Sequence, residues 1–181
     1  MSKLKNAIKN KYGLSNYQIA QLHFVLKSSL SEISKIFIIG VIFHNHLKIY
    51  IFLLFIMSIL RTFSGGIHFY TYTGCLVTSI VYMWIIISPL SHIVIPLYMR
   101  MFLLLLCIMI CYKIAPVLSK YRTNFPKKQL YFCRNITCIS IFIYTIIIYI
   151  IPENHYFVSG FWMIILHSLQ LFIAKIQKKG D

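Results

Sequence analysis

A histidine and a cysteine stand seven residues apart in a short polar segment that separates two hydrophobic stretches. The segment covers residues 61–75 and reads Arg-Thr-Phe-Ser-Gly-Gly-Ile-His-Phe-Tyr-Thr-Tyr-Thr-Gly-Cys. A cysteine becomes a nucleophile when a neighbouring base or cation favours its thiolate form. We therefore expect His68 to accept the proton of Cys75 and later to return it to a leaving amine.

Three further residues of this segment fit the same chemistry. Arg61 is its only charged residue, and its guanidinium could stabilise a thiolate or grip a substrate carboxylate. Gly65 and Gly66 let the backbone come close to a reacting group, and their N–H groups are candidate donors to an oxyanion. No acid lies near enough in the sequence to orient the histidine. That role falls to a backbone carbonyl or to one of three hydroxyl residues: Ser64, Thr71 or Thr73.

The spacing of His68 and Cys75 constrains the backbone between them. Two turns of a straight helix would place them on one face but about 10.5 Å apart along the axis. Proton transfer needs a separation of roughly 3–3.5 Å. Residues 69–73 contain few helix formers, and Gly74 directly precedes the cysteine. We therefore predict a bend within residues 69–74 that folds Cys75 back towards His68.

The composition is that of an integral membrane protein. The chain has 181 residues, of which 59% are hydrophobic, and its mean hydropathy is +0.78. Soluble domains average about 45–50% apolar residues. No linker rich in Gly, Ser or Pro separates two parts. We expect an all-α polytopic membrane protein that forms one membrane-embedded domain over residues 1–181.

The charge balance excludes several classes of function. There are 18 Lys and Arg residues against 3 Asp and Glu residues, for a formal net charge of +15. Carboxylate-bridged metal sites and catalytic carboxylate pairs need more acids than this. We therefore expect neither a metal nor another cofactor. Because the basic residues flank hydrophobic segments, anionic lipids and an acidic peptide are better partners than nucleic acid.

Hydrophobicity divides the first 60 residues into a lead-in and two apolar runs. Residues 1–30 are basic and amphipathic, as in a helix that lies on a membrane surface. The runs at 36–43 and 49–60 are each shorter than the roughly 20 residues that a spanning helix needs. The region 36–60 therefore forms either two tilted spans or one re-entrant hairpin.

Four later apolar stretches complete a predicted total of four to six transmembrane helices. The first begins at Leu76 and continues to about Leu97. Pro89 either kinks this stretch or ends it earlier. The other three predicted spans are Met101–Leu118, Ile136–Ile151 and Phe157–Ala174.

Basic residues predict which side of the membrane each loop faces. The N-terminus, the loop at 119–135 and the C-terminal tail are rich in Lys and Arg, which places them in the cytoplasm. The segment 61–75 then lies at the cytoplasmic face, so a substrate would arrive from the cytoplasm. Four residues of the loop are candidates for binding an acidic substrate: Lys120, Arg122, Lys127 and Lys128.

The pattern Arg-x3-Gly-Gly-x-His-x6-Cys, formed by Arg61, Gly65, Gly66, His68 and Cys75, resembles that of the accessory gene regulator B (AgrB) family. A second similarity is an Ala-Pro-Val sequence at 115–117 that ends a span and opens a basic loop containing Pro-Lys-Lys at 126–128. Size and hydropathy match over nearly the whole chain. The loop departs from the family pattern in having no acidic residue and in reading Leu-Ser-Lys after Ala-Pro-Val.

This resemblance implies a cysteine endopeptidase of the cytoplasmic membrane of Gram-positive bacteria. Such proteins process a short pro-peptide of the AgrD type into a cyclic quorum-sensing signal, and they are thought to act as homodimers. By this resemblance, His68 and Cys75 are catalytic, while Arg61, Gly65 and Gly66 support activity. The alternative is a non-enzymatic membrane transporter or assembly component that uses residues 61–75 as a re-entrant element.

Overall fold

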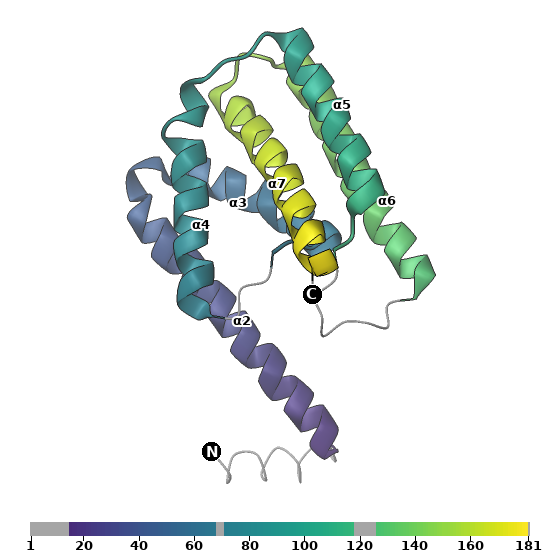
Figure 1. Cartoon of the computed structure of the whole chain (residues 1–181). Helices are drawn as coiled ribbons and strands as arrows, with labels where there is room; N and C mark the ends of the chain where they lie inside the picture. The colour runs from purple at the N-terminus through teal and green to yellow at the C-terminus, as the bar shows by residue number, and fades with distance from the viewer. Residues whose placement is uncertain (1–14, 68–70, 118–125, 181) are drawn as a thin grey trace. The chain divides into compact units, whose positions relative to one another are not determined.

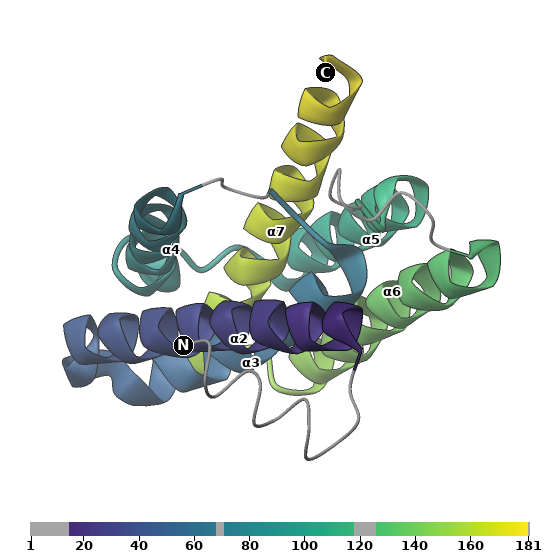
Figure 2. The ribbon, with the colours of Figure 1, turned by 90° about the horizontal axis from the view of Figure 1, so that it is seen from below.

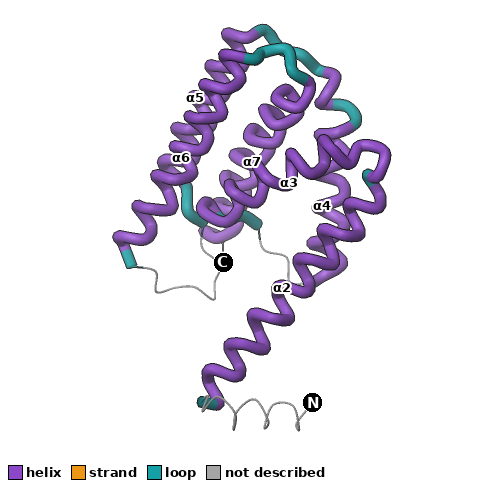
Figure 3. The backbone as a smooth tube through the Cα atoms, turned by 180° about the vertical axis from the view of Figure 1, so that it is seen from behind, coloured by secondary structure: helices purple, strands orange, loops and turns teal. Residues whose placement is uncertain are grey.

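The computed structural model describes residues 15–67, 71–117 and 126–180, and their regular structure is helical (Figure 1, Figure 3). The described residues form no strand, which confirms the prediction of an all-α protein. Within the described residues six α-helices occur in chain order: α2 (Asn16–Ile42), α3 (Leu47–Ser64), α4 (Tyr72–Ile87), α5 (Leu97–Ile114), α6 (Lys127–Ile150) and α7 (His155–Gly180). Two single-turn 3-10 helices, η1 (His44–His46) and η2 (Leu90–His92), precede α3 and α5.

The chain divides into two compact units after Ile42. In the first unit, α2 is one continuous helix of 27 residues in which Glu32 and Lys35, one turn apart, form an ion pair. The amphipathic lead-in predicted for residues 1–30 lies partly outside the described residues. Its described part joins residues 36–42 in the same helix, so this first apolar run is not a separate element.

Five stretches of the described chain are long and apolar enough to cross a membrane. They are His44–Ser64, Tyr72–His92, Leu97–Ile114, Lys127–Ile150 and His155–Gln177. Five lies within the predicted range of four to six, and the chain is a polytopic helical membrane protein. Because residues 44–64 suffice for a whole span by length and composition, they need not be the second arm of a short re-entrant hairpin.

Prolines decide where two of these helices end. The α4 helix ends at Ile87, two residues before Pro89, so the proline ends this helix rather than kinking it. The α5 helix covers Leu97–Ile114, and the predicted end at Leu118 was wrong. Ala115 is extended, with φ −74° and ψ 149°, because the ring of Pro116 disfavours helical geometry in the residue before it.

The second unit, Phe43–Asp181, is packed around α7. This helix lies between α4 on one side and α5 and α6 on the other, and α3 crosses it obliquely (Figure 2). Phe161, Met163, Ile164 and Leu171 of α7 are fully buried among these helices. The α4 helix contacts α7 less than α3 and α5 do, so the helix that carries Cys75 lies at the margin of the bundle.

Five helix termini lie at one end of this unit, which we call the Cys75 end. They are the starts of α4 and α6 and the ends of α3, α5 and α7 (Figure 1). The connections at 88–96 and 151–154 lie at the opposite end. Residues 61–75, the Ala-Pro-Val sequence and the C-terminal helix therefore approach the same side of the bundle.

Candidate functional site

The polar segment begins inside a helix, because α3 continues to Ser64 and includes Arg61. Gly65 terminates the helix, and its N–H group donates to the carbonyl oxygen of Arg61 at 3.1 Å. The glycine has φ 79° and ψ −147°, a conformation that residues with a Cβ atom rarely adopt. The first glycine of the pair is thus required by the end of α3.

A second contact makes the same position intolerant of a side chain. The N–H group of Val117 donates to the carbonyl oxygen of Ser64 at 2.9 Å, and Gly65 pairs with Val117 in an isolated parallel bridge. A Cβ atom on Gly65 would lie 3.1 Å from the carbonyl carbon of Val117 and would overlap its oxygen. The two sequence similarities noted above, the Arg-to-Cys pattern and Ala-Pro-Val, therefore touch in space.

Cys75 lies in the first turn of α4. Thr71 caps this helix: its Oγ1 accepts from the N–H of Gly74 at 3.2 Å, and its carbonyl accepts from the N–H of Cys75 at 3.2 Å. The backbone of Thr71 is extended, with φ −108° and ψ 143°. The chain thus bends at Thr71, within the stretch 69–74 where we predicted a bend, and Gly74 is already inside the helix. The positive end of the helix dipole favours an anion near the thiol.

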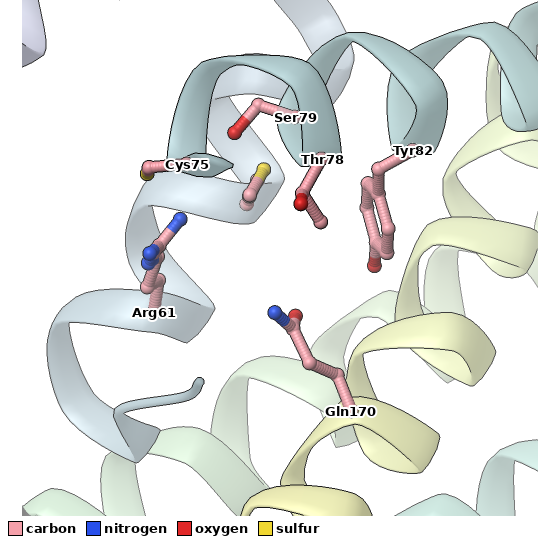
Figure 4. Close-up of a pocket in the computed structure, with 7 residues that line it drawn as sticks. Arg61, Cys75, Thr78, Ser79, Tyr82 and Gln170 are labelled. Carbon is pink, nitrogen blue, oxygen red and sulfur yellow. The ribbon is translucent and has the colours of Figure 1, made fainter. Parts of the chain in front are cut away.

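Cys75 and Arg61 line one partly open pocket (Figure 4). Arg61 enters it from α3 with its guanidinium towards the first turn of α4, and Gln170 enters from α7 on the opposite side. The remaining lining residues are Met57, Thr78, Ser79 and Tyr82. A thiol, a guanidinium and an amide from three helices thus line one opening.

The structure describes only some of the other predicted site residues. His68, Lys120 and Arg122 lie outside the described residues. Lys127 and Lys128 are exposed in the first turn of α6, at the Cys75 end. The N–H group of Gly65 donates to the carbonyl oxygen of Arg61. Gly66 is buried, and nothing lies within 4 Å of the position that a Cβ atom on Gly66 would take.

Two side chains of α7 belong to this region, although sequence analysis assigned them no role. His167 Nε2 lies 2.6 Å from Ser64 Oγ, and Gln170 lines the Cys75 pocket. Tyr82 of α4 donates its hydroxyl to the carbonyl of Met163 at 3.2 Å, on the same face of α7. Polar residues inside an apolar span are costly and usually functional, and this signal could have singled out both side chains.

The remaining cysteines have the character of packing residues. Cys107 and Cys111 are buried in α5, and Cys111 Sγ lies 3.7 Å from Ser168 Oγ. Cys133 and Cys138 are half-buried on α6, and none of the five cysteines forms a disulfide. Within residues 15–67, 71–117 and 126–180, no three His, Cys, Asp or Glu side chains are grouped as a metal site would require.

Comparison with known proteins gives two matches. The model of the accessory gene regulator B family matches residues 1–172. An AgrB-like protein of Clostridium beijerinckii is 36% identical over 76 residues, which is 41% of this chain and 38% of that relative. The aligned region therefore spans well under half the length of this curated relative. No solved structure matches the chain.

Proposed function

The chain belongs to the accessory gene regulator B family, and from this premise we propose that it is a membrane-bound cysteine endopeptidase that processes a quorum-sensing pro-peptide. The observation that carries the proposal is the shared pocket of Cys75 and Arg61 at the start of α4. We propose that the guanidinium of Arg61 and the positive end of α4 stabilise the negative charge on the Cys75 sulfur during its attack. The substrate is a short peptide of the AgrD type, and the product is a cyclic autoinducing peptide.

In the first step, Cys75 attacks a backbone carbonyl carbon of the pro-peptide. His68 takes the thiol proton and gives it to the leaving amine as the C–N bond breaks, which releases the C-terminal part of the pro-peptide. The carbonyl oxygen carries negative charge in the tetrahedral intermediate. The N–H of Gly66 is the better donor of the glycine pair for this oxyanion, because that of Gly65 is bonded to Arg61.

In the second step, a thiol or hydroxyl of the bound peptide attacks the thioester formed with Cys75. His68 takes the proton of the attacking group, the new ring bond forms as the carbon–sulfur bond to the enzyme breaks, and the proton returns to the departing Cys75 sulfur. Exchange between thioesters is nearly isoenergetic, so ring closure succeeds only when water is kept from the thioester. A pocket beside the membrane that holds the peptide's own nucleophile in place raises its effective concentration above that of water.

Charge at the Cys75 end supports an acidic substrate. Lys127 and Lys128 are exposed there, at the positive end of α6, and Arg61 lies in the pocket. Among the described residues of the second unit, Glu153 is the only acid, and it lies in the connection at the opposite end. We propose that this end faces the cytoplasm, that the loop residues Lys120 and Arg122 add to the binding surface, and that the protein acts as a homodimer.

The test is cleavage of a tagged AgrD-type pro-peptide by the protein in liposomes. Wild-type protein should release the C-terminal fragment and form a hydroxylamine-sensitive acyl-enzyme. Cys75→Ala should insert in the membrane normally and do neither, whereas Cys133→Ala should retain both activities because Cys133 is on α6 and outside the pocket. Cleavage by Cys75→Ala at the wild-type rate would refute the mechanism.

Thiol labelling separates this function from that of a non-enzymatic transporter or assembly component. Cys75 and Cys133 are both half-buried, so Cys133 is a better reference than Cys107 or Cys111, whose burial alone would slow their labelling. An activated Cys75 should react with iodoacetamide near neutral pH at least several times faster than Cys133. This advantage should fall in His68→Ala. Equal labelling rates for the two cysteines would favour the alternative function.

A further inference from the structure

A buried hydrogen bond joins the end of α3 to the middle of α7. Ser64 Oγ and His167 Nε2 are 2.6 Å apart, although the residues are separated by 103 positions in the sequence. Ser64 is 0% exposed and His167 is 2% exposed. A buried polar pair costs free energy unless each group is satisfied, so this contact constrains the two helices strongly.

The second partner of the serine assigns the direction of this hydrogen bond. Ser64 Oγ also lies 2.6 Å from the carbonyl oxygen of Leu60, which can only accept. The single hydroxyl proton therefore goes to Leu60, and the serine oxygen accepts a hydrogen bond from Nε2–H of His167. His167 is thus a hydrogen-bond donor at this nitrogen, which is not available there as a base for Cys75.

The bond fixes the turn of α3 that supplies Arg61 to the pocket. Ser64 lies three residues after Arg61, and its carbonyl accepts from Val117. Gly65 is the next residue, and its N–H ends the helix with a hydrogen bond to the Arg61 carbonyl. One side chain of α7 therefore anchors the end of α3, the exit towards Gly66, and the Ala-Pro-Val segment together. Gln170, three residues after His167, reaches the pocket from the same helix.

We propose that His167 is a positioning residue of the Cys75 site, acting through Ser64 on the last turn of α3. Its N–H donor keeps Arg61 in the pocket and keeps the backbone at Gly65 and Gly66 in the arrangement that the reaction uses. This inference rests on the proposed function, because it assigns a role in the same site. It attributes no proton transfer to the His167 ring.

Three variants test the donor role. His167→Gln retains an N–H donor of similar reach, His167→Leu retains bulk without a donor, and Ser64→Ala removes the acceptor. We expect kcat for pro-peptide cleavage to fall about 10- to 100-fold in His167→Leu and in Ser64→Ala, with KM changed less than about threefold. His167→Gln should recover most of kcat. The double variant Ser64→Ala/His167→Leu should be no worse than either single variant.

Amide hydrogen exchange provides a readout that does not depend on cleavage. The amides of Gly65 and Val117 should exchange faster in His167→Leu and in Ser64→Ala than in wild type, and at nearly the wild-type rate in His167→Gln. Unchanged exchange and unchanged kcat in Ser64→Ala, the smallest change, would overturn the inference. So would a His167→Gln protein as inactive as His167→Leu with an altered pH profile, because the ring would then act as an acid or base.

The two proposals fail in distinguishable ways. If Cys75→Ala still cleaves the pro-peptide, the proposed enzyme mechanism is wrong, and exchange at Gly65 and Val117 alone decides whether His167 holds the turn. If Cys75→Ala is inactive while the Ser64 and His167 variants keep wild-type kcat, the mechanism stands and the positioning role is refuted.

Discussion

Gly65→Ala should damage the junction where α3 meets residues 115–117. An alanine would have to adopt φ near 79° with ψ near −147°, which costs on the order of 1–3 kcal/mol for a residue with a Cβ atom. Its methyl group would overlap the carbonyl oxygen of Val117 and lie 3.1 Å from the carbonyl carbon. The end of α3 and residues 115–117 would have to move apart to relieve that overlap.

Separation would break the hydrogen bond from Val117 N–H to the Ser64 carbonyl, which is worth about 1 kcal/mol. The total expected loss in the free energy of unfolding is therefore about 2–4 kcal/mol. We expect pro-peptide cleavage to fall as well, since the same displacement moves the turn that carries Arg61.

The measurement is reversible unfolding of purified protein in mixed micelles, titrated with SDS and followed by tryptophan fluorescence. Gly66→Ala is the matched control: nothing lies within 4 Å of the position of its Cβ atom, so backbone strain acts there without an overlap. It should lose less stability than Gly65→Ala. A Gly65→Ala protein within about 0.5 kcal/mol of wild type would refute the close approach of Val117, because strain and overlap together cannot cost so little.

Three other substitutions have definite expected outcomes. Gly160→Leu should lower the free energy of unfolding by at least 1–3 kcal/mol in the same titration, because a Cβ atom there already overlaps the Tyr144 hydroxyl and lies 2.8 Å from Ile56 Cδ1. Arg100→Leu should lower the thermal unfolding midpoint, since Arg100 is 4% exposed and donates to the Pro152 carbonyl at 2.6 Å; Arg100→Lys, which keeps a donor, should lower it less. Gln170→Leu should slow pro-peptide cleavage several-fold, whereas Leu169→Ala, one residue along α7 on an exposed face, should leave the rate unchanged.

Hydrophobic runs predicted the existence of the spanning helices better than their ends. A long apolar stretch has one low-energy state in a bilayer, a helix that satisfies its own backbone, so α5, α6 and α7 could be located from composition. Their ends depend on local chemistry. The Ala115–Pro116 pair stops α5 at Ile114, four residues before the predicted end, although the hydrophobicity continues through Leu118.

The candidate site was predictable only in part. The types and spacing of Arg61, the two glycines and Cys75 pointed to thiol chemistry, and the structure brings Arg61 and Cys75 into one pocket. The capping of α4 by Thr71 was missed, because a threonine signals a helix start only when the residues after it are known to be helical. The catalytic role of His68 and the binding roles of Lys120 and Arg122 stay predictions.

Sequence alone determined that the chain is a basic, helical membrane protein with one polar segment of candidate catalytic residues, because composition, charge and motif spacing are local properties of the chain. Tertiary structure alone decided that the Gly65 amide is used to close α3, that Val117 excludes a side chain at that glycine, and that His167 holds Ser64. The contacts of Gly65 with Val117 and of Ser64 with His167 join residues 52 and 103 positions apart, by the difference of their residue numbers. Hydrophobic periodicity says which helices enter the membrane, but side-chain packing between them selects which polar groups meet.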